Sequence, residues 1–415
     1  MATVNILQQV ITYNESNLAL LLNSFAFIST ANMKFQRFND DIPKNLGDTV
    51  SFDLPPRFTT TNSLVVSFQS AEQRVQQLTV DQQASTAYEF TAQQFIFNVR
   101  DYMDKFGTSA VAEIGTKVEQ NVAELAETNT FRFYGDGVTP ISTYLQLANS
   151  LAFLRNFGAA KNNTMGYLSD LTFPQIVNSG LNQFTPMRGD REAMSWEIGD
   201  FSNCKWYQSN LLKTHTAGTD GNAGSVLTVV SVTKNADDAV ISITFSGTAA
   251  ASDANSVKVY DKFQFSDGVA NRTDLRFRTF IGHAVSQCPV QFRSTADAAS
   301  TGGSQVTVNI YPPLKASAGK NQNINVEIVA GMQVTILPDH RCGLIMAGNP
   351  LFLAMPKLPE EVPYPTSVQT DPDSGASIRQ YYGSLFGQNQ RGMIHDIIWG
   401  RTLVDEYAMM VALPV

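Results

Sequence analysis

Few side chains in this sequence have both the type and the spacing that chemistry requires. His340 and Cys342 lie close together in the expected turn Pro338-Asp-His-Arg-Cys342, and such a pair is half of a zinc site. A second pair at ligand spacing is missing, so the sequence does not favour zinc. Asp371-Pro-Asp-Ser-Gly375 resembles the start of a calcium loop but lacks the closing glutamate, and it is typical of a tight turn. We therefore predict neither a metal site nor a cofactor.

The motifs of common enzyme classes are absent. The sequence has no Gly-x-Ser-x-Gly, no phosphate loop, no dinucleotide-binding Gly-x-Gly-x-x-Gly and no His-Glu-x-x-His. The four histidines are scattered among unlike neighbours: His215, His283, His340 and His395. With 37 acidic residues some carboxylate pair is always available, so a hydrolase stays open as an alternative without positive support. We predict that the chain is not an enzyme.

Composition predicts a globular chain with little charge. A length of 415 residues indicates two or three structural units. Hydrophobic residues make up 43% and charged residues 16%, against roughly 25% charged in typical soluble domains. Such a surface is either covered by neighbours or polar and rich in Gln, Asn, Ser and Thr. The net charge of −8 argues against strong direct binding of nucleic acid, which needs clustered Lys and Arg.

No segment predicts a secretory signal or a membrane span. The longest apolar run, Leu18 to Ile28, is interrupted by two polar residues and is too short for a bilayer. We therefore expect no membrane partner and a chain that is soluble in the cell that makes it. Cys204, Cys288 and Cys342 are odd in number, which fits buried free thiols in a reducing compartment.

The N-terminal part of the sequence predicts an arm followed by a hairpin. Residues 1–42 open with an apolar helical stretch in which Glu15 is the lone charge, where it could meet a basic partner or face water. Residues 43–93 alternate as two strands around Pro55-Pro56, which cannot donate to a sheet ladder. Because this hairpin has little apolar mass, it needs support from its own domain or from another subunit.

The middle of the chain changes from mixed to all-β patterning. An apolar stripe at helical spacing predicts a helix from about Ser109 to Thr128, and Ile141–Phe157 and Thr164–Leu168 predict a second helix and a strand. Between Thr219 and Lys315 there is no glutamate and there are only three leucines, while Val, Ile, Thr and Phe alternate with polar residues. This block predicts short antiparallel strands, inserted as a module into an α/β domain.

A cluster of arginines lies within this block. If the segment around them is extended, Arg272, Arg276 and Arg278 share one face. They could pair with a neighbouring subunit or with phosphate, or they could face solvent.

Several of these segments resemble one known family. Gly47-Asp-Thr-Val-Ser-Phe-Asp-Leu-Pro-Pro-Arg-Phe58, followed by Leu78-Thr-Val-Asp-Gln-Gln83 and Tyr88-Glu-Phe90, is similar to the extended-loop hairpin of major capsid proteins of short-tailed double-stranded-DNA bacteriophages. Lys117-Val-Glu-Gln-Asn-Val-Ala-Glu-Leu-Ala126 is similar to the spine helix of that family. Tyr260-Asp-Lys-Phe-Gln-Phe265 resembles a strand of its inserted domain, and Gly392 to Val415 resembles its C-terminal strand pair.

The resemblance implies an α+β chain with the tailed-phage and herpesvirus major capsid fold. That fold has an N-terminal arm, an extended β hairpin loop, a spine helix, and peripheral and axial α/β domains, here with an inserted all-β barrel-like domain. The implied segments are an arm at 1–42, a hairpin at 43–93, the spine helix and peripheral domain at 94–140, a first axial and peripheral part at 141–218, the inserted β domain at 219–334, and a second axial and peripheral part at 335–415.

The function implied by the resemblance is structural. Copies of the chain would form hexamers and pentamers of an icosahedral shell around phage double-stranded DNA, through a scaffolded procapsid that expands on packaging. The implied partners are the chain itself, a scaffolding protein, a portal, and packaged DNA bound without sequence specificity, in a virion capsid assembled in the host cytoplasm. Subunit-contact candidates are Phe52, Pro55, Pro56, Arg57, Phe58, Arg272, Arg276 and Arg278, and Glu15 is the scaffold-contact candidate. The alternative is a β-rich phage or bacterial surface module that binds carbohydrate or protein.

Overall fold

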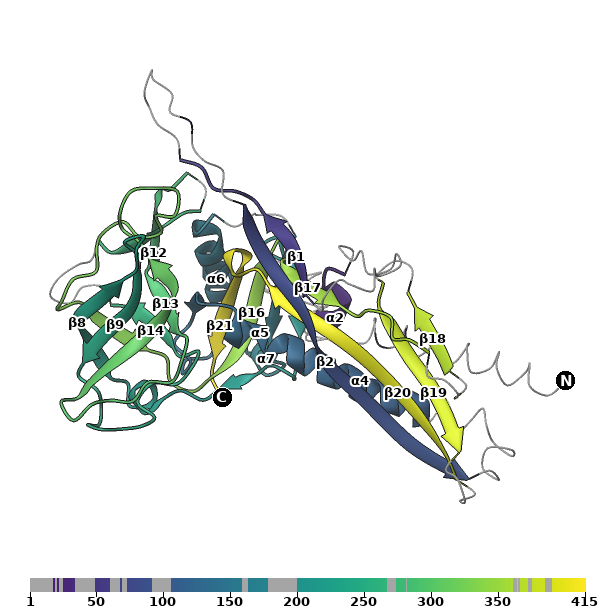
Figure 1. Cartoon of the computed structure of the whole chain (residues 1–415). Helices are drawn as coiled ribbons and strands as arrows, with labels where there is room; N and C mark the ends of the chain where they lie inside the picture. Colours follow the sequence, from purple (N-terminus) through teal and green to yellow (C-terminus); the bar gives the residue numbers. More distant parts are fainter. Residues whose placement is uncertain are drawn as a thin grey trace. The chain divides into compact units, whose positions relative to one another are not determined.

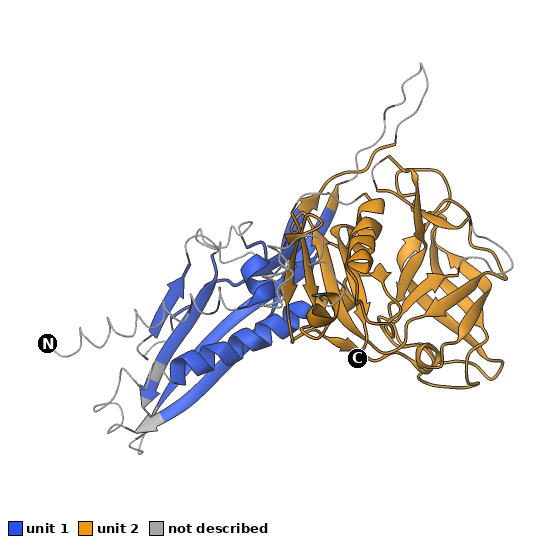
Figure 2. Cartoon of the chain, turned by 180° about the vertical axis from the view of Figure 1, so that it is seen from behind, with its two compact units in different colours: residues 1–52, 75–123, 351–403 blue, residues 53–74, 124–350, 404–415 orange. Residues whose placement is uncertain are grey.

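The computed structural model describes two compact units, coloured separately in Figure 2. Unit 1 comprises residues 1–52, 75–123 and 351–403, and unit 2 comprises residues 53–74, 124–350 and 404–415. The described residues are 25–33, 49–59, 73–91, 106–158, 163–177, 200–266, 274–280, 282–360, 366–371, 375–384 and 390–415, with the single positions 18, 21, 68 and 364. No helix among them is both long and apolar enough to cross a bilayer.

Unit 1 is built on one sheet whose strands follow the order β1-β2-β20-β19-β18, with β17 also paired to β20 (Figure 1). Its strands are β1 (Thr49–Leu54), β2 (Arg74–Thr91), β17 (Leu351–Ala354), β18 (Thr366–Thr370), β19 (Ser377–Ser384) and β20 (Gln390–Leu403). β2 pairs antiparallel with β20 from Val80 to Thr91. The second arm of the predicted hairpin is therefore supported by a strand of its own chain.

The predicted helix 109–128 is divided into α4 (Thr108–Ala123) and α5 (Leu125–Thr128). Its apolar stripe is buried as expected, with Val111, Val118 and Val122 fully inaccessible. In unit 1, α4 also holds α2 (Ala26–Thr30), because the Glu119 carboxylate accepts the backbone N–H groups of Phe27 at 2.8 Å and Ile28 at 3.1 Å. A carboxylate at this position caps the free N–H groups of a helix start.

Unit 2 contains a seven-stranded sheet and a closed barrel. The sheet has the order β3-β21-β16-β4-β6-β5, with β7 paired to β16. Its strands are β3 (Phe133–Tyr134), β4 (Thr164–Leu168), β5 (Asp200–Phe201), β6 (Cys204–Gln208), β7 (Thr214–His215), β16 (His340–Ala347) and β21 (Ala408–Leu413). The helices in the described part of the unit are α5, α6 (Tyr144–Asn156), α7 (Thr172–Val177), α9 (Thr219–Asn222) and the 3-10 turn η4 (Asp405–Tyr407).

The inserted β module is confirmed as a closed six-stranded barrel in the order β10-β13-β14-β9-β8-β15. Its strands are β8 (Val226–Lys234), β9 (Val240–Ser246), β10 (Lys262–Phe265), β13 (Gln291–Ser294), β14 (Gln305–Leu314) and β15 (Gln333–Ile336), and β11 (Arg276–Arg278) pairs separately with β12 (Val285–Pro289). Its core contains stacked aromatic rings, Phe263 and Phe292 lying 4.9 Å apart. Phe131 and Phe157, which precede the block in sequence, belong to the same apolar cluster. The six segment boundaries given above stay predictions.

The expected C-terminal strand pair is wrong as a pairing. Both strands exist, but β20 lies in the sheet of unit 1 and pairs with β2, β17 and β19, whereas β21 pairs with β16 and β3 in unit 2. The turn η4 separates them in sequence. Every residue of β21 is buried, which is typical of a central strand rather than of a hairpin arm at an edge.

Candidate assembly site at the base of the hairpin

The hairpin base is held by a three-residue ionic clamp within unit 2. Arg57 follows the two prolines after β1, and Arg74 begins β2. The Nη2 groups of both arginines donate to Oε1 of Glu406, and Nη1 of Arg74 lies 3.3 Å from Oε2 of the same carboxylate. Glu406 is only 5% exposed. One buried carboxylate therefore fastens both ends of the segment between β1 and β2, and we call this place the hairpin base.

The electrostatics of this clamp favour its charged form. Burial alone would raise the pKa of Glu406, but the hydrogen bonds and positive charges of Arg74 and Arg57 hold that pKa below its usual value. Arg57 also stacks over the ring of Phe280, with its guanidinium carbon 4.9 Å from the ring centroid. The guanidinium is thus oriented by an aromatic face as well as by the carboxylate.

The turn η4, which carries Glu406, is itself anchored. The Tyr311 hydroxyl donates to Oδ2 of Asp405 at 2.6 Å, and Nη2 of Arg132 donates to the Asp405 backbone oxygen at 2.6 Å. Arg132 is fully buried, its guanidinium carbon lies 4.6 Å from the ring centroid of Phe157, and burial lowers its pKa to about 10. These bonds fix the position of the clamp carboxylate because η4 cannot move without breaking them.

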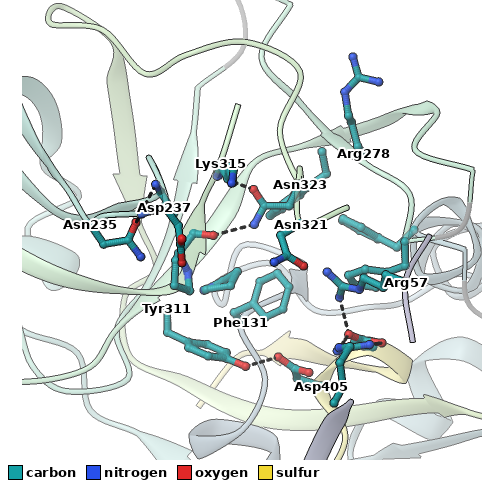
Figure 3. A pocket seen from close by; sticks show the side chains of 18 residues that line it. Arg57, Phe131, Asn235, Asp237, Arg278, Tyr311, Lys315, Asn321, Asn323 and Asp405 are labelled. Atoms are coloured by element: carbon teal, nitrogen blue, oxygen red, sulfur yellow. Dashed lines mark hydrogen bonds and ion pairs between the residues drawn. The ribbon is translucent and has the colours of Figure 1, made fainter. Parts of the chain in front are cut away.

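A cavity of about 290 Å³ opens beside the clamp (Figure 3). Its wall is cationic and amide-rich on one side, and it carries aromatic rings and the η4 carboxylates on the other. Figure 3 shows Arg57 directed toward η4, and Arg278 pointing away from the Tyr311–Asp405 bond. The lining includes Arg57, Arg74, Arg278, Lys315, Asn321, Asn323, Phe131, Phe277, Tyr311, Asp405 and Glu406.

The hairpin candidates from the sequence differ in exposure. Pro55 and Pro56 are exposed, and Phe58 is 55% exposed, so these three apolar residues present free surface beside the clamp. Phe68, farther along the hairpin, is fully exposed. Phe52 is half-buried, and its ring packs 4.4 Å from that of Phe352 in unit 1. Its ring is therefore partly engaged within its own chain.

The arginine candidates of the inserted block lie on β11. Arg276 and Arg278 flank buried Phe277, as expected for residues on one face of a strand. Nη1 of Arg278 donates to the His283 backbone oxygen at 2.6 Å, and Arg278 lines the same cavity as Arg57. The structure thus brings Arg57 and Arg278 to one cavity. Arg272 and Glu15 lie outside the described residues.

Sequence reasoning missed the residues that hold the hairpin. Arg74 and Glu406 carry no motif, and Asp405, Arg132 and Phe280 were not singled out. The available signal was an arginine at each end of the polar stretch that follows the prolines, together with an Asp-Glu pair between two terminal strands.

No group of three or more His, Cys, Asp or Glu side chains lies together as a metal site in the described part of the chain. Cys204, Cys288 and Cys342 are free and buried, as predicted. Burial raises the pKa of Cys342 to about 12, so this thiol stays protonated and inert at neutral pH.

Comparison with known proteins finds similarity only in structure. No protein-family model and no curated protein matches the sequence. A solved structure from Mycobacterium phage Che8 matches with a TM-score of 0.47 and 9% identity, covering 93% of this chain and 90% of that one. The capsid of the Cyanophage P-SCSP1u matches with a TM-score of 0.43 and 9% identity, covering 88% of this chain and 84% of that one. The capsid of Ralstonia phage GP4 matches with a TM-score of 0.43 and 8% identity, covering 89% of this chain and 84% of that one. All three TM-scores are below 0.5.

Proposed function

We propose that this chain is a major structural subunit of a capsid shell that encloses phage double-stranded DNA. The observation that carries the proposal is the hairpin base, where a buried ionic clamp holds the chain while Pro55, Pro56 and Phe58 stay exposed beside it. Apolar side chains that are held in place and left uncovered are typical of a subunit interface. The function is structural, and no catalytic step is assigned to the chain.

The finer features follow from the family resemblance. One sequence would form both hexamers and pentamers of an icosahedral shell, assembled in the host cytoplasm as a scaffolded procapsid that expands on packaging, in a phage of the short-tailed type. A scaffolding protein, contacted through the arm that carries Glu15, and a portal are the further partners. The net charge of −8 supports an inner wall on which packaged DNA slides without sequence-specific binding.

The rival reading, a carbohydrate-binding surface module, needs aromatic side chains on an exposed surface of the barrel. The barrel aromatics noted in the sequence do not supply them. Phe245, Phe263 and Phe265 are buried in the barrel core, and the ring of Tyr260 lies beneath the Arg293 guanidinium at 5.2 Å. We therefore retain the shell subunit as the proposal.

Negative-stain electron microscopy with sedimentation tests this proposal most directly. The full chain is expressed alone and together with the neighbouring phage genes. Closed shells, or spirals and partial shells without a scaffold, are the expected result. A monomer or small ring in both preparations would refute the shell proposal.

A substitution at the hairpin base sharpens the same test. In Phe58→Ser the clamp is intact but exposed apolar surface is lost, which removes about 2 kcal/mol per subunit contact and raises the concentration needed for assembly roughly thirtyfold. Val138→Ser removes a similarly exposed apolar residue, 66% accessible, from another loop and is the matched control. Equal assembly of both variants would show that the hairpin base is not an interface.

A further inference from the structure

The chain passes between the sheet of unit 2 and the barrel at a neck formed by β7 and β16. β7, before the barrel, and β16, after it, are antiparallel neighbours, with His215 opposite His340 and Thr214 opposite Arg341. All six barrel strands lie between these two in sequence, from Val226 to Ile336 (Figure 1). The chain therefore enters and leaves the barrel side by side, and side chains at this point control how firmly the two parts are joined.

His215 makes two carboxylate contacts at the neck, one to each part. Its Nδ1 lies 2.6 Å from Oε1 of Glu127 on α5, and its Nε2 lies 2.7 Å from Oδ1 of Asp261, which directly precedes barrel strand β10. His215 is 3% exposed and Asp261 is inaccessible. The imidazole thus bridges the flanking helix and the barrel inside a site closed to solvent.

The hydrogen-bond inventory of the ring determines its charge. A neutral imidazole has one N–H, so it can donate to only one carboxylate, whereas an imidazolium donates to both. A proton on a carboxylate would be the other solution. Asp261 is unsuited to it because its second oxygen, Oδ2, already accepts the backbone N–H groups of Lys258 at 2.8 Å and Gly218 at 3.2 Å.

The other titratable groups at the neck come from every element packed there. Lys262 on β10 is fully buried and donates to the backbone oxygens of Glu127, at 2.7 Å, and Thr130. The ring centroid of His340 lies 5.2 Å from that of His215, and its Nδ1–H donates to the Pro338 backbone oxygen at 2.7 Å. The remaining groups that act electrostatically on this cluster are Cys342 on β16, Arg293 on β13 and Lys213.

We propose that His215 is a protonation switch at the neck. As an imidazolium it connects the barrel to α5 through Asp261 and Glu127, and loss of its proton weakens this connection. Deprotonation leaves one carboxylate oxygen without its ring donor at a largely buried position, and the loss of such a charge-assisted bond is unfavourable. The proposal concerns the inserted barrel alone and does not depend on the shell function.

The direction of the pKa shifts agrees with this geometry. Burial alone would lower the pKa of His215, but its bonds to Asp261 and Glu127 and their charges raise it above the usual value. The stabilisation is therefore fully present below the unfolded-state pKa of about 6.5 and is lost as pH rises through the higher folded-state pKa. Burial lowers the pKa of the neighbouring His340 to about 4, so this ring stays neutral over the same range.

Lys262 contributes with the opposite sign and must be separated from His215. Burial lowers the pKa of Lys262 to about 7, so above that pH the folded chain lacks a proton that the unfolded chain still carries. Lys262 therefore makes the free energy of unfolding larger as pH rises, up to the ordinary lysine pKa near 10.4. A direct reading of His215 is needed rather than a stability curve alone.

Nitrogen NMR of the full-length chain labelled at histidine reads the ring directly, in solution or, for assembled protein, in the solid state. The two ring nitrogens of an imidazolium resonate close together, whereas those of a neutral ring are far apart. We expect one of the four histidines to be an imidazolium still at about pH 7, above the ordinary histidine pKa of about 6.5. His215→Gln assigns it by loss of the signal, and Asp261→Asn should convert it to the neutral form. A neutral His215 ring at about pH 7 in the unaltered chain would overturn the proposal.

Backbone amide exchange then tests whether the proton affects the joint. After correction for intrinsic rates, β10 and the segment after β7 should lose about tenfold in protection between about pH 6 and pH 9, as expected for the loss of one buried hydrogen bond. His395→Gln, which replaces another buried histidine, is the control and should keep this pH dependence. His215→Gln should abolish it. Unchanged protection in the unaltered chain across this range would refute the switch, and Glu127→Gln replaces Asp261→Asn if the latter does not fold.

Discussion

The hairpin base and the barrel neck each hold together two segments that are far apart in the sequence, but they do so with different side chains. Each fastens together the two ends of a long stretch of chain that belongs to unit 2. At the hairpin base two arginines, which stay charged at any ordinary pH, share the carboxylate of Glu406. At the neck His215 and Lys262 carry the bonds, and both titrate readily when buried. The comparison indicates that the hairpin is held permanently and the barrel conditionally.

Solvent access accounts for the choice of residues. The side chains of Arg57 and Arg74 are 20% and 27% exposed, so their charges retain part of their hydration. The neck is almost completely buried, where each charge loses its hydration and persists only with several donors or acceptors around it. The clamp near solvent is weaker per bond, but its strength does not depend on pH. The buried contacts of the neck are stronger, but their strength depends on pH.

The largest loss of stability is expected from breaking a second hydrogen-bonded contact between the barrel and the sheet of unit 2. Gln291 on β13 is 1% exposed, accepts the Phe133 backbone N–H at 3.0 Å and donates to the Phe133 oxygen at 2.9 Å. Gln291→Leu leaves both buried backbone groups without a partner and should lower the free energy of unfolding by about 3 kcal/mol. Urea unfolding of the full chain measures it.

Gln305→Leu, at an exposed position of β14, is the matched control for this substitution. It should change the free energy of unfolding by less than about 0.5 kcal/mol. Similar losses in the two variants would contradict a specific fastener at Phe133 and would weaken the contrast between neck and hairpin base.

A smaller effect is expected at the hairpin base. Glu406→Gln keeps the shape of the side chain but removes the charge that both arginines share. Because those arginines are partly solvated, we expect the free energy of unfolding in urea to fall by about 1 to 2 kcal/mol. This loss should be the same at every pH between about pH 6 and pH 9. Glu327→Gln, which alters an exposed pair with Lys234, is the control and should cost almost nothing. A loss in Glu406→Gln that grew with rising pH would place a titratable group in the clamp and remove the contrast.

What the sequence predicts well here is local. The helix stripe, the strand Thr164–Leu168 and the all-β block are encoded in neighbouring residues through periodicity and composition, and each is present in the structure. The candidates Pro55, Pro56 and Phe58 rest on the family resemblance of one local segment, and their role in subunit contacts stays a prediction.

What the sequence did not predict depends on distant contacts. Arg57 is 349 residues from Glu406, and His215 is 46 residues from Asp261, and no spacing rule connects them. The four histidines looked scattered, yet strand pairing brings His215 and His340 together. The terminal strands were expected to pair because they are neighbours in sequence, and the anchored turn η4 leads to a different sheet instead.

The smallest expected effect tests whether charge alone defines the hairpin clamp. Arg57→Lys preserves the positive charge toward Glu406, but an ammonium lacks the planar fork and stacks less well over Phe280. Arg74 still binds the same carboxylate, so we expect a loss of only about 0.5 kcal/mol in urea unfolding and an unchanged pH profile below about pH 9. Arg57→Gln, which removes the charge, should cost more than Arg57→Lys. If the two variants were equal, packing on Phe280 rather than charge would hold Arg57, and the permanence of the hairpin attachment would come from the aromatic ring instead of from the arginine's ionisation.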